Sequence, residues 1–188
     1  MPHLEKTTDT ITLAGGCFWC LEAIFKRIKG VISVISGYTG GTTTHPTYDA
    51  VCSGKTGHAE AIQITYDTTI ITLQELLDIF WKLHDPTTVN QQGADIGTQY
   101  RSAVFYNSDE EKSIILETKS LLEKSGIYPH PFVTEVSKLS TFYPAETYHQ
   151  DYYNQNQNQG YCRLVIDPKI KKLYKDYTDK IKPDFNSF

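Results

Sequence analysis

The chain lacks most features of a secreted or membrane protein. Four of its 188 residues are cysteine, too few for a disulfide scaffold, and no stretch approaches the roughly 18 apolar residues of a membrane span. Residues 1–10 carry no apolar signal-peptide core. We therefore expect a cytoplasmic, reducing setting and no membrane partner. In such a setting, paired cysteines are more often catalytic or metal-binding than structural.

A surplus of positive charge is also missing. The net charge is −4 and the isoelectric point is near 5.8, which argues against a nucleic-acid partner because that interaction depends on clustered Lys and Arg. Nothing resembles a heptad repeat or a long apolar stripe, so we expect a monomer. The basic residues gather only near the C-terminus, on what we interpret as the solvated face of an amphipathic helix: Lys169, Lys171, Lys172, Lys175 and Lys180.

The periodicity of the apolar residues predicts strands and helices in the order βαββαβ. This order is typical of a ferredoxin-like fold, so we predict an α+β, two-layer sandwich with a mixed sheet. Residues 1–188 are expected to form a single catalytic domain, with a core at about 10–140 and a long irregular segment at about 141–188. The predicted elements are strands at 10–14, 31–38, 58–66, 100–106 and 132–139, helices after Cys17, at 73–84 and between Ser108 and Gly126, and a last helix with Asp167 as N-cap.

The segment Gly15-Gly16-Cys17-Phe18-Trp19-Cys20 lies where a predicted strand gives way to a predicted helix. A cysteine in or just before the first turn of a helix is near free N–H groups and the positive end of the helix dipole. Such a cysteine tends to have a lowered pKa and to react as a nucleophile. The alternative is a structural thiol, buried under the two aromatic residues.

Glu60 is the best candidate for an acid that works with this thiol. Strand alternation places it on the same face as Ile62, Ile64 and Tyr66. Burial there would raise its pKa and keep a proton available for a leaving group. The alternative is a carboxylate at the strand end that reaches solvent past the apolar face.

The other cysteines suggest how an oxidised Cys17 is recycled. Cys20, one helical turn away, or Cys162, which we expect on a mobile loop after a run of Asn and Gln, would attack it to give a disulfide that an external dithiol reduces. We interpret Cys52 as structural. The sequence holds one C-x-x-C pair and no histidine at a spacing that completes a zinc site, so no metal is expected.

Several motifs together resemble the peptide methionine sulfoxide reductases of the A type. They occur in the family's order between about residues 13 and 162. The matching motifs are Gly16-Cys17-Phe18-Trp19, Gly37-Tyr38-Thr39-Gly40-Gly41, Pro46-Thr47-Tyr48, Thr56-Gly57-His58-Ala59-Glu60, His84-Asp85-Pro86-Thr87-Thr88, Gly97-Thr98-Gln99-Tyr100-Arg101-Ser102 and Gly160-Tyr161-Cys162.

The resemblance implies a repair enzyme that reduces the S epimer of methionine sulfoxide in proteins or peptides. It implies that Cys17 attacks the sulfoxide sulfur and that Glu60 protonates the oxygen. It further implies a set of binding residues, with Tyr48 and Tyr100 on the oxygen, Asp95 as a carboxylate at the same site, and Phe18 with Trp19 around the methyl group. A sulfoxide accepts hydrogen bonds and has no donor, so O–H donors beside an apolar cup suit it.

The resemblance also implies thioredoxin or another dithiol as the reductant, and no bound cofactor. Cys162 matches the family's C-terminal resolving cysteine, and we favour it over Cys20 because it is expected on a mobile segment. Many relatives have glycine where this chain has Cys20. Two other functions remain open: a general dithiol–disulfide oxidoreductase of thioredoxin type, which the C-x-x-C pair alone would suit, and a non-enzymatic module that binds oxidised methionine.

Overall fold

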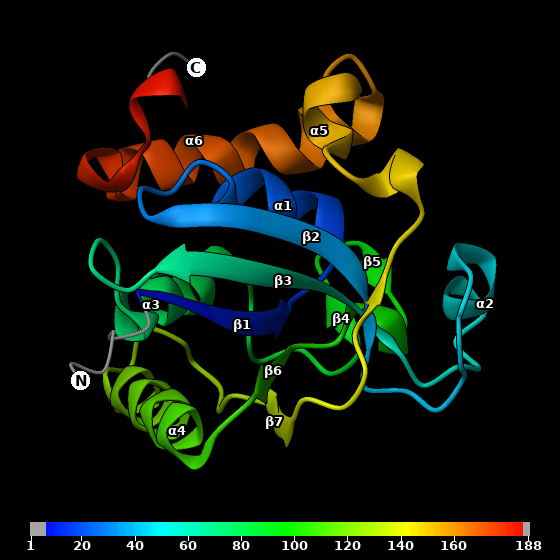
Figure 1. The fold of residues 1–188 in the computed structure, drawn as a ribbon, viewed down its shortest axis with the longest axis horizontal. Helices are drawn as coiled ribbons and strands as arrows, with labels where there is room; N and C mark the ends of the chain where they lie inside the picture. The colour runs from blue at the N-terminus through cyan, green and yellow to red at the C-terminus, as the bar shows by residue number, and fades with distance from the viewer. Residues whose placement is uncertain (1–6, 186–188) are drawn as a thin grey trace, which may run out of the picture.

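A computed structural model describes residues 7–185, and within them six strands form one sheet in the order β7-β6-β1-β3-β2-β8 (Figure 1). The predicted βαββαβ order is present as β1, α1, β2, β3, α3 and β6. Further elements are inserted between them or follow. The strands are β1 (Thr8–Ala14), β2 (Val31–Thr39), β3 (Ala59–Asp67), β4 (Gln91–Gln92), β5 (Asp95–Ile96), β6 (Ala103–Tyr106), β7 (Glu135–Lys138) and β8 (Tyr143–Pro144). The α-helices are α1 (Phe18–Phe25), α2 (Tyr48–Cys52), α3 (Leu73–Leu83), α4 (Asp109–Lys124), α5 (Tyr152–Gln155) and α6 (Asp167–Asp176).

The sheet is mixed, as predicted. β1 runs antiparallel to both β3 and β6, and β2 runs antiparallel to β3 and β8. Only the pairing of β7 with β6 is parallel among the described strands. The fold is therefore a mixed α/β structure built around four central antiparallel strands.

The two faces of the sheet differ in the size of their side chains. Ile11, Leu13 and Ile62 are fully buried on one face, where they pack with α1 and α3. The other face carries small residues, which allow the segment with Phe142 to lie close. A side chain at Gly37 would meet the Phe142 ring and the Tyr143 carbonyl oxygen at 2.4 Å, so glycine is required for this approach. The small and aromatic residues of this second cluster are Ala14, Ala59, Ala61, Ala103 and Phe105.

The predicted helix boundaries follow from side-chain caps. Thr72 and Glu75 form the expected capping box at the start of α3. Ser108 caps α4 by accepting from the Glu111 N–H, whereas the Glu111 carboxylate accepts from the N–H of Asn107. Both helices begin where the sequence predicts.

Two elements differ from the prediction. Tyr100 lies in a 3-10 turn, Thr98–Tyr100, and strand β6 begins only at Ala103. Asp167 is not an N-cap, because α6 continues a helix that already includes the π-helical segment Cys162–Ile166. Pro168 has no N–H to donate to the preceding turn, which is consistent with an irregular turn at this point.

The expectation of a mobile loop at Cys162 is wrong. Cys162, Ile166, Ile170 and Leu173 are all fully buried, and their spacing of four, four and three residues forms one helical stripe. This stripe packs with α1, beside which α6 lies in Figure 1. The polar run before Cys162 begins in α5 and continues through a short turn at 156–159. Across residues 7–185, helices long and apolar enough to span a bilayer do not occur.

Candidate functional site

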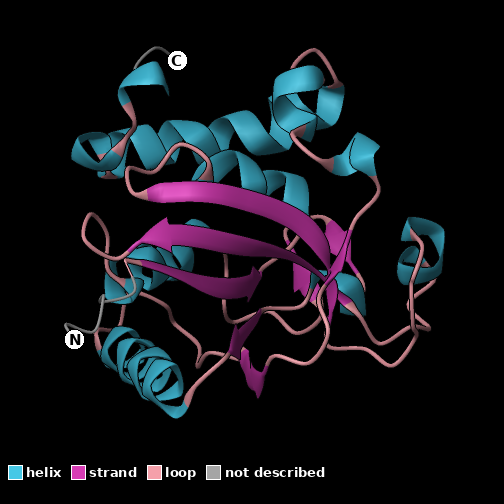
Figure 2. Cartoon of the chain, in the orientation of Figure 1, coloured by secondary structure: helices cyan, strands magenta, loops and turns pink. Residues whose placement is uncertain are grey.

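The site lies where α1, α2, β3, β5 and the C-terminal segment meet, at the right-hand end of the sheet in Figure 1. Long loops gather at this end, whereas α4 lies at the opposite end (Figure 2). Every residue that the sequence singles out for a role is placed on one of these elements or on the 3-10 turn that holds Tyr100.

A tight turn presents Cys17. Gly16 has a φ of +91°, which favours glycine, and a side chain there would come within 2.6 Å of the Gln92 side chain. Cys17 follows in an extended conformation as the N-cap residue of α1 and is 7% exposed. The Phe18 N–H, in the first turn of α1, donates to the Glu60 carboxylate at 3.0 Å. The turn thus brings a nearly buried thiol next to a buried carboxyl group.

The two thiols of the C-x-x-C pair share a hydrogen bond. Burial, the bond to Cys20 and the charge of Glu60 raise the pKa of Cys17. The same bond from Cys17, helped by the Lys169 ammonium, lowers the pKa of Cys20 to about 7. The expectation of a lowered pKa at Cys17 is therefore wrong, mainly because the thiol is buried. The first N–H of the helix, moreover, bonds to Glu60.

Glu60 has the environment predicted for an acid. It is 1% exposed, on the same face of β3 as Ile62 and Ile64. Burial raises its pKa to about 8 against the opposing bond from the Phe18 N–H, and the negative charge of Asp95 adds to the rise. At neutral pH the Glu60 carboxyl is therefore protonated in most of the molecules.

Aromatic rings surround the start of α1. The Phe18 ring lies 6.5 Å from that of Tyr48 and 5.2 Å from that of His149, measured between centroids. The Trp19 ring stacks on Tyr152 at 3.6 Å, and its N–H donates to Nδ1 of His149 at 3.1 Å. The predicted apolar residues are thus held in place largely by His149 and Tyr152, which lie more than 100 positions further along the chain.

Two tyrosines and Cys52 lie near Glu60. Burial raises the pKa of both Tyr48 and Tyr100, and the nearby Glu60 charge raises each further. Their hydroxyls are therefore protonated donors over the physiological pH range. Cys52, which we interpreted as structural, is partly buried, and its thiol hydrogen-bonds the Tyr48 hydroxyl.

Asp95 and Cys162 are the remaining two residues that the sequence predicts at the site. The Tyr161 hydroxyl donates to the Asp95 carboxylate at 2.6 Å and lies 3.7 Å from the Cys20 sulfur. This contact joins strand β5 to the C-terminal helix beside the thiol pair. Cys162 packs in the same core cluster as Cys17 and Cys20, and burial raises its pKa.

Sequence reasoning missed three residues at the site. His149 is 1% exposed, and its Nε2 has no hydrogen-bond partner among the described residues. Because Nδ1 accepts from Trp19, a neutral His149 ring carries its proton on Nε2, as a free donor. Tyr161 is adjacent to Cys162 in the motif Gly160-Tyr161-Cys162, and this position could have indicated that it lies at the site. Lys169 belongs to the basic group that we interpreted as a solvated face, and it is instead half-buried near Cys20.

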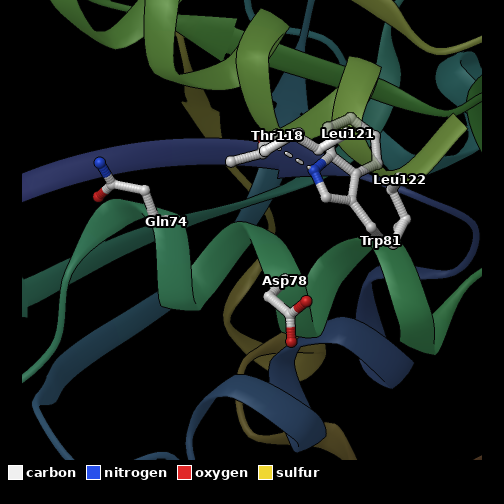
Figure 3. A pocket seen from close by; sticks show the side chains of 6 residues that line it. All are labelled: Gln74, Asp78, Trp81, Thr118, Leu121 and Leu122. Atoms are coloured by element: carbon white, nitrogen blue, oxygen red, sulfur yellow. Dashed lines mark hydrogen bonds between the residues drawn. The ribbon is translucent and has the colours of Figure 1, made fainter. Parts of the chain in front are cut away.

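A separate pocket of about 210 Å³ lies between α3 and α4 (Figure 3). The Trp81 N–H donates to the Thr118 hydroxyl at 3.1 Å across it. Cys17 and Glu60 do not line it. Residues 7–185 contain no cluster of three His, Cys, Asp or Glu side chains that could hold a metal ion.

A nearly buried thiol beside a buried, protonated carboxyl group and a second thiol defines a thiol-dependent oxidoreductase. The comparisons with known proteins identify which one. The family model described as peptide methionine sulfoxide reductase matches residues 9–182, and the chain belongs to this family.

The relatives match over most of their length. The peptide methionine sulfoxide reductase MsrA of Sulfolobus acidocaldarius is 52% identical over 172 residues, which are 92% of this chain and 97% of that protein. The reduced form of Mxr1 from Saccharomyces cerevisiae is 36% identical with a TM-score of 0.76, and the match covers 83% of this chain and 90% of that one. Mxr1 in complex with Trx2 is 26% identical with a TM-score of 0.54, covering 81% and 89%. The family assignment decides against both alternative functions left open by the sequence.

Proposed function

We propose that this protein reduces the S epimer of methionine sulfoxide, in oxidised proteins and peptides, to methionine with Cys17 as the nucleophile. The observation that carries the proposal is the hydrogen bond that holds the Glu60 carboxyl at the first turn of α1, directly beside Cys17. Burial keeps this carboxyl protonated at neutral pH. A thiol and an acid are the two groups that transfer of a sulfoxide oxygen requires.

The first step moves one oxygen atom. The Cys17 sulfur attacks the sulfoxide sulfur and takes its oxygen, so that the thiol becomes a sulfenic acid and the sulfoxide becomes a thioether. Glu60 gives a proton to the oxygen and recovers one from the Cys17 thiol, which balances the step. The hydroxyls of Tyr48 and Tyr100 hold the oxygen, with Asp95 at the same site.

Selectivity for one epimer follows from two fixed subsites. Phe18 and Trp19 receive the terminal methyl group, while the tyrosine hydroxyls receive the oxygen. With both groups fixed, only one configuration at sulfur faces Cys17. The partners that hold the two rings, His149 and Tyr152, support a rigid methyl cup.

The sulfenic acid is then resolved inside the chain. Cys20 lies in the first turn of α1, which begins directly after Cys17, and its interaction with the Cys17 thiol lowers its pKa, whereas Cys162 lies in a separate helical segment and burial raises its pKa. We therefore assign the first attack to Cys20 rather than to Cys162, which sequence reasoning favoured. The Cys20 sulfur bonds to Cys17 and expels hydroxide, which leaves as water. Cys162, which belongs to the same core cluster and is affected by the charge of Cys20, would then accept the disulfide in a second exchange.

Turnover requires an external dithiol, and we propose a thioredoxin. The relative Mxr1 forms a complex with Trx2, which supports this choice. Further features of the proposal are a cytoplasmic, monomeric protein and a single catalytic domain over residues 1–188. We also propose a ferredoxin-like core, supported by the antiparallel order β6-β1-β3-β2.

Disulfide mapping after one turnover tests this sequence of steps. With one equivalent of a methionine sulfoxide peptide and no reductant, we expect one methionine per chain and, at the earliest times, a Cys17–Cys20 disulfide in the peptide map. Cys20→Ser is expected to form methionine at the same rate but to accumulate sulfenic acid before a slower Cys17–Cys162 disulfide. A Cys17–Cys162 disulfide that forms first in the wild-type protein would contradict the assignment of Cys20.

A further inference from the structure

Arg27 is a buried cation just beyond the end of α1. It is 4% exposed, and one of its terminal nitrogens, Nη1, donates to the Ala23 carbonyl oxygen at 2.6 Å. The guanidinium carbon lies 5.1 Å from the centroid of the Tyr153 ring and 4.8 Å from that of the Phe185 ring. Two aromatic rings and one carbonyl group thus surround a side chain that stays charged at every physiological pH.

None of the carboxylates in residues 7–185 forms an ion pair with Arg27. The nearby acids have other partners, since Glu22 and Asp151 pair with Lys26 and Asp167 accepts from the Tyr153 hydroxyl. The buried Nε of Arg27 has no hydrogen-bond partner in the part of the chain that the structure describes. Buried charges are ordinarily paired, because removing a charge from water is costly. Arg27 can therefore take an anion as its partner.

A cavity of about 410 Å³ is lined by the Arg27 side chain together with the Tyr153 and Phe185 rings. Asn154 and Gln157, whose side-chain amides can donate hydrogen bonds, line it as well. Its one carboxylate is the exposed Asp184. Cys17 and Glu60 do not line this cavity, so it is separate from the site described above.

An adjoining cavity of about 500 Å³ adds positive charge. It shares Asn154 and Phe185 with the first cavity and is lined by Lys182, which is half-buried. The Lys182 N–H donates to the Arg27 carbonyl oxygen at 2.8 Å, which keeps the two residues together. Across both cavities, three cationic side chains face two carboxylates, so the surface favours an anion. These residues are Lys26, Arg27 and Lys182, and Asp151 and Asp184.

We propose that Arg27 is the centre of a binding site for a carboxylate group. Because Nη1 is held by the Ala23 carbonyl, Nε and Nη2 remain as one edge of the guanidinium, and their two N–H groups match the two oxygens of a carboxylate. The amides of Asn154 and Gln157 can donate to the same group. The carboxylate belongs either to a small free acid or to an acidic side chain of a polypeptide. This site goes beyond the proposed reaction and does not depend on it.

Nitrogen-15 NMR of the arginine side chains tests the proposal on the wild-type protein. The chain has three arginines, and their Nε–H signals are followed while sodium acetate replaces sodium chloride at constant ionic strength. We expect a saturable shift of the Arg27 signal. The Arg101 Nε already donates to Glu135, so its signal is an internal control that should stay in place. Absence of a saturable shift at Arg27, or an equal shift at the exposed Arg163, would overturn the site.

Two variants test the geometry and the charge of the site. The backbone signals of Asn154 and Gln157 should follow acetate in the wild type and not in Arg27→Lys, which keeps the charge but loses the paired N–H edge. Asp184→Asn removes a like charge from the cavity and should tighten acetate binding by up to about fivefold. Weaker acetate binding in Asp184→Asn would contradict the site, and inorganic phosphate that binds more tightly than acetate would overturn carboxylate as the ligand class.

A blocked tripeptide with a central glutamate distinguishes the two sources of the carboxylate. Tighter binding of this peptide than of acetate would assign the site to an acidic side chain of a polypeptide, whereas equal or weaker binding would assign it to a small free acid. Both results support the carboxylate site. Because none of these titrations uses turnover, they decide the role of Arg27 whether or not the protein reduces methionine sulfoxide.

Discussion

Replacing Cys17 by serine is expected to lower methionine sulfoxide reduction by on the order of 10³-fold or more, because a serine hydroxyl cannot take up the sulfoxide oxygen as a thiol does. Serine fits the small space that the Gly16 turn leaves at the start of α1, so the fold should be retained. The measurement is methionine released per chain, with dithiothreitol in excess. Release in the first turnover should be lost together with steady-state activity.

Cys52→Ser is the matched control. Cys52 is the partly exposed thiol of the four, and a serine hydroxyl can keep the contact with the Tyr48 hydroxyl. We expect its activity to stay within a few-fold of the wild type. Activity that survives in Cys17→Ser and disappears in Cys52→Ser would show that Cys52 is the nucleophile and would overturn our assignment.

Replacing Glu60 by glutamine is expected to lower the rate of sulfoxide reduction by about 10²- to 10⁴-fold, the usual range for loss of a general acid. The pH dependence makes the prediction specific. Because burial raises the pKa of Glu60 to about 8, the carboxyl is protonated below that pH and loses its proton above it. Wild-type activity should therefore fall as pH rises through about 8, and Glu60→Gln should lack this fall.

Glu22→Gln provides a control with the same chemical change. Glu22 is also 1% exposed and burial raises its pKa, but its carboxylate binds the Asp151 N–H and Lys26 rather than the thiol region. The alkaline fall in rate should persist in this variant. A wild-type profile that stays flat through pH 8, or a fall that persists in Glu60→Gln, would show that Glu60 is not the acid.

Local pattern was sufficient to predict much of the fold and the centre of the site. The strand-to-helix junction at Cys17 and the alternation that buries Glu60 are both short-range features, and the structure confirms both placements. The start of α3 follows from Thr72 and Glu75 in the same way. Such features depend on spacing within one element, which the sequence displays directly.

Contacts between distant segments could not be predicted in this way. His149 joins Trp19 across 130 positions, and Tyr161 joins Asp95 across 66. Burial, together with Cys20 and Glu60, raises the pKa of Cys17, so the helix terminus alone predicted the wrong direction. Cys162 was misplaced because the polar run before it hid the apolar stripe that follows.

The rates of reduction of the separated S and R epimers of blocked methionine sulfoxide, with dithiothreitol in excess, decide whether the proposed reaction and its two subsites are correct. We expect turnover of the S epimer and none of the R epimer, since the methyl cup at Phe18 and Trp19 and the hydroxyls of Tyr48 and Tyr100 fix the configuration at sulfur. Turnover of the R epimer alone would mean that these two subsites are assigned the wrong way round, and turnover of neither would contradict the proposed reaction itself.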